Sequence, residues 1–287
     1  PFPVLFRRPI LLRTQHPRTH RYNQVYAEFP SPSVMSHNLQ TGNAAATQLP
    51  AQLHALLHTA GVAPLDNLGW IHVTGEDRVR WLNGMVTNSI NDLKPGEGNY
   101  NFVLSAQGRI QGTAYAFAQP ENLLLQTDRD QVAPLSATLD HFIIMDDVEL
   151  TDISDPRTGI ALIGPNAASL LASLDLPVPA PISLQTITCQ GADVTLVAAH
   201  SPLVPRFELW AAPETAAALL AVLTSAGATS VGSESLEWLR ILEGTPRYGT
   251  DIRDKELPQE TAQTRALHFA KGCYLGQEIV ERIRSRG

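Results

Sequence analysis

The feature that most constrains this chain is a run of three short apolar segments joined by tight turns. The segments are residues 100–105, 110–118 and 123–127, and the turns are residues 106–109 and 120–122. Glycine, proline or asparagine stands in each turn, as is typical between strands. Strands this close in sequence pair antiparallel, because a parallel pair needs a crossover of a dozen or more residues. The sequence therefore predicts a β-meander within a largely antiparallel sheet.

Helices and strands are predicted on both sides of the meander. Before it, apolar residues at i, i+3, i+4 and i+7 mark a helix over residues 53–60, which Gly61 ends. A strand follows at residues 68–73, and a capping box at residues 74–77 precedes a second helix. After the meander, a helical stripe covers residues 132–142. We expect these elements to pack with the meander as one α+β unit.

The second half of the chain has the order β-α-β-β-α, which is typical of a ferredoxin-like unit. Its segments are residues 160–163, 167–174, 194–198, 206–210 and 214–226. Two more helices are expected at residues 234–243 and 278–286. The predicted class is α+β, with antiparallel sheets and a ferredoxin-like lobe.

A length of 287 residues indicates one large or two coupled domains. We expect a first lobe over residues 35–157, a ferredoxin-like lobe over residues 158–232, and a completing segment over residues 233–287. Residues 1–34 hold six prolines, five arginines and one acidic residue. This tail is a targeting peptide, a basic tail, or upstream sequence before Met35 that is not part of the native protein. The chain stops directly after a predicted helix, so we expect the sequence to be a fragment.

Composition excludes several classes of protein. No apolar run approaches the roughly 20 residues of a membrane helix. Two cysteines are too few for a disulfide framework, a Cys₄ zinc site or a four-thiolate cluster, which favours a reducing, cytoplasmic setting. The net charge is −7. Because residues 1–34 carry +4, residues 35–287 carry −11. An acidic body of this kind does not suit direct binding to the phosphates of a nucleic acid. His54 and His58 have metal-compatible spacing without a third ligand nearby, so no metal site is expected.

The segment most suggestive of chemistry is residues 271–278, which read Lys271, Gly272, Cys273, Tyr274, Leu275, Gly276, Gln277 and Glu278. Two glycines bracket a cysteine just before a predicted helix. Lys271 and the helix N-terminus would both lower the pKa of the Cys273 thiol and make it reactive. The alternative is a small buried cysteine in a loop. Cys189 lies in a β-branched run and is simpler to interpret as structural.

Two charged residues could contact a ligand. Alternation in the strand over residues 206–210 places Arg206, Glu208 and Trp210 on one face, and a carboxylate beside an indole suits a flat ring with N–H donors. The alternative is an ordinary solvent face. Arg240 lies inside a helix between apolar neighbours, where an arginine usually pairs with an acid or a carbonyl, or binds a ligand carboxylate.

Residues 271–278 resemble the complete signature of the YgfZ-type folate-binding proteins, whose mitochondrial relatives serve iron–sulfur cluster maturation. Residues 73–88, 106–110 and 243–251 agree with the same family, and the resemblance covers roughly residues 50–287. The family is similar in fold to the glycine-cleavage T-protein, a tetrahydrofolate-dependent aminomethyltransferase. That fold implies three lobes around a folate pocket, closed by a C-terminal β-barrel. This chain stops before any barrel.

The resemblance implies a tetrahydrofolate pocket that contains Tyr100, Glu208 and Arg240. T-proteins carry an aspartate pair where this sequence has Gly112 and Thr113. The resemblance therefore favours an accessory protein that supports iron–sulfur enzymes or assembly factors, including enzymes that modify tRNA, with Cys273 for thiol chemistry or partner contact. The alternatives are an aminomethyltransferase-like enzyme and a structural module without ligand.

Overall fold

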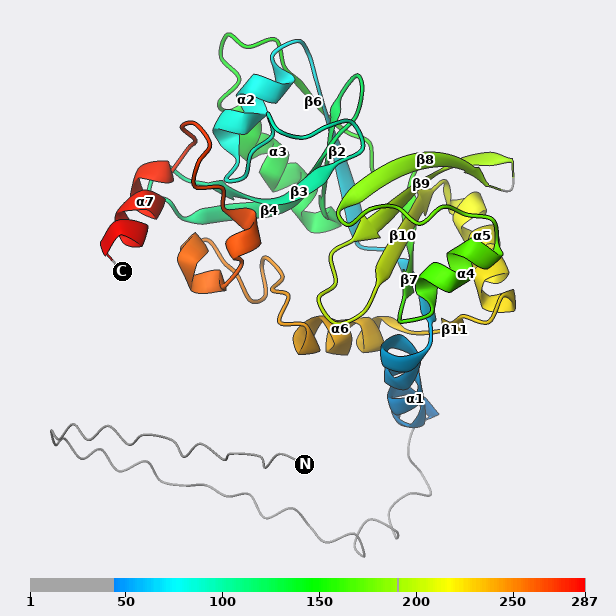
Figure 1. The fold of residues 1–287 in the computed structure, drawn as a ribbon. Coiled ribbons are helices and arrows are strands. Elements are labelled where there is room, and N and C mark those ends of the chain that lie inside the picture. The colour runs from blue at the N-terminus through cyan, green and yellow to red at the C-terminus, as the bar shows by residue number, and fades with distance from the viewer. Residues whose placement is uncertain (1–43, 190, 287) are drawn as a thin grey trace, which may run out of the picture. The chain divides into compact units, whose positions relative to one another are not determined.

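The computed structural model describes residues 44–189 and 191–286, which form two β-sheets with helices on their outer faces (Figure 1). The predicted tail over residues 1–34 lies outside the described residues. No helix in the described part of the chain is long and apolar enough to cross a membrane. The α+β class with antiparallel sheets is confirmed.

The first sheet contains the predicted meander and is antiparallel throughout, in the order β3-β4-β5-β2-β6. Its strands are β2 (Leu68–Thr74), β3 (Gly98–Leu104), β4 (Ile110–Ala118), β5 (Leu123–Asp128) and β6 (Glu149–Asp152). Helices α2 (Arg78–Met85) and α3 (Val132–Asp140) cover one face. Their apolar residues, among them Leu82 and Leu135, share a core with alternate residues of the sheet such as Ala114 and Ala116.

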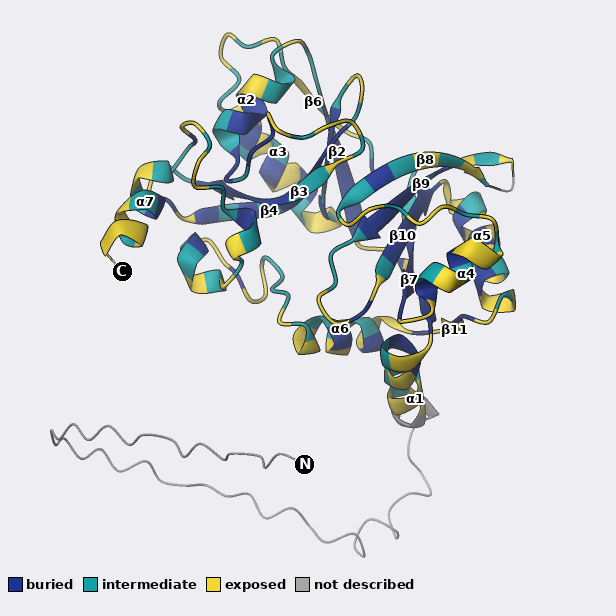
Figure 2. Cartoon of the chain, in the orientation of Figure 1, coloured by how far each residue is buried: buried dark blue, intermediate teal, exposed yellow. Residues whose placement is uncertain are grey.

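The second sheet has the order β11-β1-β7-β10-β9-β8. Its strands are β1 (Gly61–Leu65), β7 (Thr158–Ile163), β8 (Ser183–Cys189), β9 (Ala192–Ala199), β10 (Arg206–Ala211) and β11 (Thr229–Ser230). Helices α4 (Ala167–Ser173) and α5 (Pro213–Ser225) cover one face, with Leu171 and Leu219 in its core. Figure 2 shows buried strands and exposed outer faces on both helices.

Strand β1 changes the expected division of the chain. It falls within residues 35–157, the range expected for the first lobe, but belongs to the second sheet, where it separates β11 from β7. The three strands predicted for the ferredoxin-like unit, β7, β9 and β10, lie in this sheet in the order β7-β10-β9. The prediction missed β1 because Gly61 has the position of a helix-ending glycine, and because Pro64 interrupts a five-residue strand.

The inner faces of the two sheets share one core. Trp70 and Phe117 of the first sheet pack against Trp210 of the second, with ring centroids 5.4 and 5.9 Å apart respectively. Only Asp66 and Asn67 separate β1 from β2, so the chain passes from one sheet to the other in two residues. This short connection holds the strand ends of the two sheets together.

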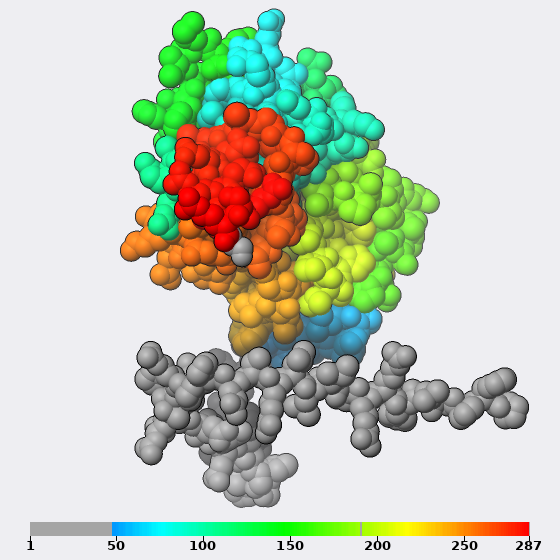
Figure 3. Space-filling view, turned by 60° about the vertical axis from the view of Figure 1, so that its left-hand side comes forward, coloured from blue at the N-terminus to red at the C-terminus, as the bar shows by residue number. Residues whose placement is uncertain are grey.

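The C-terminal segment joins the two sheets a second time. It begins with α6 (Ser233–Leu242), which packs beside α1 (Ala44–His58) at the second sheet, and ends with α7 (Gln277–Arg286) at the first. In between, Ile110 N–H donates to the Glu256 carbonyl, and Leu275 N–H donates to the Gly84 carbonyl. Figure 3 shows this orange and red end of the chain covering part of the first lobe.

Gly276 fits tightly into the meander turn. Its φ is +79°, and an added Cβ would lie 2.6 Å from the Ser105 carbonyl oxygen and 3.1 Å from Gly108 Cα. Backbone atoms cannot yield as a flexible side chain could, and an L-residue is strained at this φ.

We therefore expect Gly276→Ala to lower the free energy of unfolding by about 2–3 kcal/mol, measured by urea denaturation. Gly272 is the control, because an added Cβ there meets nothing within 4 Å. Gly272→Ala should change the free energy of unfolding by less than about 0.5 kcal/mol. Equal losses in the two variants would show that the contact with the turn is unimportant.

Candidate functional site

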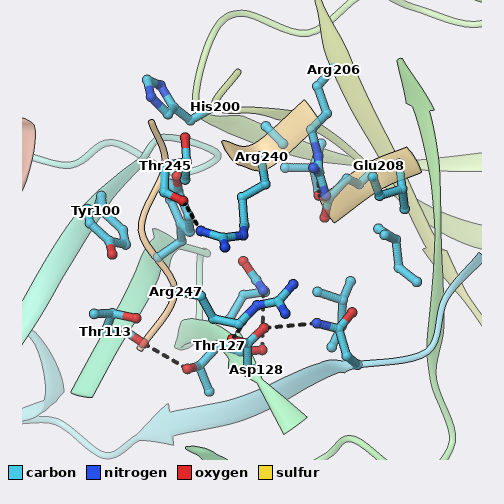
Figure 4. Close-up of a pocket in the computed structure, with 18 of the residues that line it drawn as sticks. Tyr100, Thr113, Thr127, Asp128, His200, Arg206, Glu208, Arg240, Thr245 and Arg247 are labelled. Atoms are coloured by element: carbon cyan, nitrogen blue, oxygen red, sulfur yellow. Dashed lines mark hydrogen bonds and ion pairs between the residues drawn. The ribbon is translucent and has the colours of Figure 1, made fainter. Parts of the chain in front are cut away.

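A cavity of about 600 Å³ lies where the two sheets meet (Figure 4). Strands β3, β4 and β5 line it from the first sheet, β9 and β10 from the second, and α6 with the loop after it closes another side. The β1–β2 connection, residues 66–67, also lines it. This volume is in the range of sites that bind cofactors and other small molecules.

Four aromatic side chains form a row along the cavity. Tyr100 of β3 lies opposite Tyr115 of β4 in the sheet register, and their ring centroids are 4.9 Å apart. Phe117 follows two residues later on the same face of β4, 6.4 Å from Tyr115, and Trp210 of the second sheet lies 5.9 Å beyond it. The row offers extended aromatic surface on which a flat ring can stack.

Glu208 lies at the Trp210 end of this row. The Arg206 guanidinium donates to Glu208 Oε1 from Nε at 2.9 Å and from Nη2 at 2.7 Å, and Trp210 Nε1 donates to Oε2 at 3.0 Å. The structure thus brings together the three residues that strand alternation placed on one face. The Glu208 side chain is only 7% exposed. Oε1 already accepts two hydrogen bonds, whereas Oε2 accepts one and can accept a further one.

Arg240 lines the cavity but is largely committed to protein groups. Its guanidinium forms a bidentate pair with Glu237 at 2.6 and 2.9 Å and donates to Asp251 at 2.6 Å and to the Thr245 carbonyl at 2.5 Å. Four of its five N–H groups are therefore occupied. Hydrogen bonding to Glu237 is the main reason that the pKa of Arg240 is raised. Arg240 fixes the loop after α6 and retains one N–H for a ligand.

Tyr100 is buried, and burial raises the pKa of its hydroxyl. Of Gly112 and Thr113, only Thr113 lines the cavity. Gly112 faces the other way, because an added Cβ there would lie 2.9 Å from Leu135 Cδ1 in the core under α3. The cavity wall at this point is therefore uncharged.

Three further cavity residues were not singled out from the sequence. Arg265 donates to the Tyr115 hydroxyl at 2.8 Å, and its guanidinium lies 4.1 Å from the Tyr100 ring centroid. Among the residues that the structure describes, no carboxylate forms an ion pair with it. Burial lowers the pKa of His200 to about 4, so this side chain is neutral at physiological pH. Arg265 lies in the three-residue 3₁₀ helix Thr264–Ala266, His200 directly follows β9, and Asp128 ends β5, so no sequence periodicity identifies them.

Lys271 holds the signature segment in place. Its ammonium group donates to the carbonyl oxygens of Asn83, Val86 and Asn88 at 2.6, 2.7 and 2.7 Å, around the C-terminal end of α2. Burial lowers the pKa of Lys271 to about 8, so the group remains charged at neutral pH. Lys271 donates its three protons to these carbonyls, which are neutral and leave its positive charge in place, so activation of Cys273 by Lys271 stays a prediction.

The rest of the signature divides into packed and exposed residues. Tyr274 is buried, and its backbone N–H donates to Gln277 Oε1 at 3.3 Å. Glu278 is exposed and pairs with Arg282 four residues later on α7. Cys273 is also exposed, whereas Cys189 of β8 is half-buried. Lys271, Tyr274 and Gly276 therefore anchor the loop, whereas Cys273 stays accessible to solvent.

Three comparisons relate this chain to known proteins. The family model described as the GCVT N-terminal domain matches residues 17–271. A chloroplastic protein of Arabidopsis thaliana, named as a transferase, is 26% identical over 226 residues, 77% of this chain and 52% of that protein. The aminomethyltransferase of Thermus thermophilus is 27% identical over 230 residues, 79% of this chain and 66% of that protein.

A solved structure shares the fold. The glycine cleavage system aminomethyltransferase T from Bartonella henselae superposes with a TM-score of 0.73 at 20% identity, over 83% of this chain and 66% of that one. The chain spans between about half and two-thirds of the length of these three relatives.

We expect Lys271→Met to lower the free energy of unfolding by about 3 kcal/mol, because it leaves carbonyl oxygens without a donor inside the protein. Lys94→Met is the control, since Lys94 is exposed and should change stability by less than about 0.5 kcal/mol. Thermal and urea unfolding of both variants measure the difference. A Lys271→Met protein as stable as Lys94→Met would mean that the carbonyl contacts contribute little.

Proposed function

Because the chain belongs to the GCVT N-terminal domain family, we propose that it binds a reduced folate in the cavity between its two sheets. The observation that carries the proposal is the buried Glu208 carboxylate at the end of an aromatic row. A pterin ring is flat and presents adjacent N–H donors, which match a carboxylate acceptor and aromatic stacking. The cavity volume of about 600 Å³ suits a ligand of this size.

Each proposed binding residue has a separate task. Glu208 accepts N–H groups of the pterin, and Arg206 and Trp210 keep its carboxylate oriented. Tyr100 provides aromatic surface at the other end of the row. Arg240 orders the loop that closes the cavity and offers its remaining N–H. When bound, a tetrahydrofolate supplies the carrier for a one-carbon unit.

Folate-dependent one-carbon transfer, as in an aminomethyltransferase, is the activity that the relatives support best. Aminomethyltransferases are named among them, and one solved member shares the fold. Thr113 and Gly112 bring no carboxylate to the wall where T-proteins carry their aspartates. A transferase of this kind therefore needs another acidic group in the cavity.

An accessory role in iron–sulfur enzyme assembly or repair is the second candidate. It is supported by the complete signature over residues 271–278 and by the exposed thiol of Cys273 within it. In this proposal the folate cavity and the thiol are separate, and iron–sulfur enzymes or their assembly factors contact the signature loop. A cytoplasmic location stays a prediction.

Glu208→Ala should weaken the binding of tetrahydrofolate by about 1–3 kcal/mol, because the pterin donors lose their acceptor. Glu214→Ala, at an exposed position at the start of α5, is the control and should leave affinity unchanged. Isothermal titration calorimetry measures both, with circular dichroism to verify folding. Equal affinity in wild type and Glu208→Ala would remove Glu208 from the site.

Cys273 should react with iodoacetamide faster than Cys189, because it is exposed on a loop and Cys189 is half-buried in a strand. Mass spectrometry of each cysteine peptide gives the two rates. Cys273→Ala should leave folding and tetrahydrofolate binding intact and reduce the activity of iron–sulfur client enzymes in cells. Faster labelling of Cys189, or normal client activity in Cys273→Ala, would count against the accessory role.

A further inference from the structure

Six carboxylates line the cavity, and they differ in how many of their oxygens are occupied by protein donors. They are Asp66, Asp128, Glu208, Glu234, Glu237 and Glu243. Glu208 accepts two hydrogen bonds from Arg206, and Glu237 accepts two from Arg240. Glu243 accepts one from the Ser201 hydroxyl. Asp66 and Glu234 are exposed at the rim. Asp128 has a side chain only 28% exposed, accepts one hydrogen bond from Asn67 and forms a long ion pair with Arg247.

The two oxygens of Asp128 have different surroundings. Oδ1 accepts from Asn67 Nδ2 at 3.1 Å, which ties Asp128 to the connection between the sheets. Oδ2 lies 3.9 Å from Arg247 Nε, beyond hydrogen-bond distance. Within residues 44–189 and 191–286, Oδ2 therefore accepts no hydrogen bond. Figure 4 shows Asp128 next to Thr127, whose hydroxyl donates to the Thr113 carbonyl at 2.7 Å.

The charges around Asp128 come from three elements. Arg247 and Arg240, on the loop after α6 and on α6, lower its pKa, whereas Glu237 of α6 and Asp130 beside β5 raise it. Burial outweighs them, so the pKa of Asp128 is raised above that of an ordinary aspartate. The nearest hydroxyl from β3, that of Tyr100, stays protonated because burial also raises its pKa. Asp128 thus changes charge closer to neutral pH than a surface aspartate does.

We propose that Asp128 is the acidic group through which this cavity binds an amine N–H of its ligand, with Oδ2 as the acceptor. The proposal rests on the proposed function, since the ligand is a reduced folate with ring N–H groups. It places the acid on β5, next to the wall of β4 where Thr113 stands. The ionised carboxylate forms a charge-assisted hydrogen bond, and protonation removes that charge.

The direction of the pH effect follows from this arrangement. Asp128 must be ionised to accept the ligand N–H at full strength, so affinity should fall as the pH drops through its pKa. Removal of the charge by substitution should lower affinity at high pH and abolish the part of the pH dependence that Asp128 causes. Protonation of the free ligand changes the affinity of every variant by the same factor, so it cancels when the variants are compared at one pH.

The experiment is a calorimetric titration of tetrahydrofolate, kept under argon, between pH 5 and pH 8. Wild type should bind more weakly as the pH falls from 8 toward 5, with a limiting loss of about tenfold once Asp128 is protonated. Asp128→Asn should bind about tenfold more weakly than wild type at pH 8, with little further change toward pH 5. Glu214→Gln, which removes an exposed carboxylate outside the cavity, should keep the wild-type profile.

The possible outcomes separate this inference from the proposed function. A wild-type pH profile in Asp128→Asn overturns the role of Asp128 while leaving folate binding intact. No binding by wild type at any pH overturns the proposed function and this role with it. If Asp128→Asn does not fold, Asp128→Glu replaces it: a pH midpoint displaced from that of wild type supports the inference, and an unchanged midpoint contradicts it.

Discussion

The two-residue connection between β1 and β2 is the constraint on which the rest of the structure depends. β1 lies inside the second sheet and β2 inside the first, so Asp66 and Asn67 hold the adjoining ends of these two strands close together. The tryptophans at positions 70 and 210 then pack in a shared core, with ring centroids 5.4 Å apart. The cavity lies at the edge of this shared core, and each sheet forms one of its walls.

The charges of the cavity are arranged before any ligand binds. Arg206 is paired with Glu208, and Arg240 with Glu237, each at hydrogen-bond distance. Such fixed pairs keep a carboxylate oriented and limit the reorganisation that binding would otherwise require. Arg265 differs, because it stacks on Tyr100 and has no carboxylate partner among the described residues. The cavity thus has a carboxylate end and a cationic end along its aromatic row.

The signature segment combines a structural part and an accessible part. Lys271 satisfies carbonyls around the end of α2, and Gly276 allows the loop to approach the meander turn. The Lys271 contacts join segments more than 180 residues apart, and together with Gly276 they explain most of the motif by packing. The exposed Cys273 is not explained by packing, which is why a chemical or partner-binding role is proposed for it.

The sequence by itself determined the meander, the α+β class and most helices, because hydrophobic periodicity and turn residues act over short distances. It also determined that Arg206, Glu208 and Trp210 share a strand face, since alternation is a local property of the backbone. Only the tertiary structure decided that β1 joins the second sheet, that Arg240 is mostly bound by Glu237 and Asp251, and that Asp128 and Arg265 face the cavity. These features depend on contacts between residues distant in the sequence, which no local pattern records.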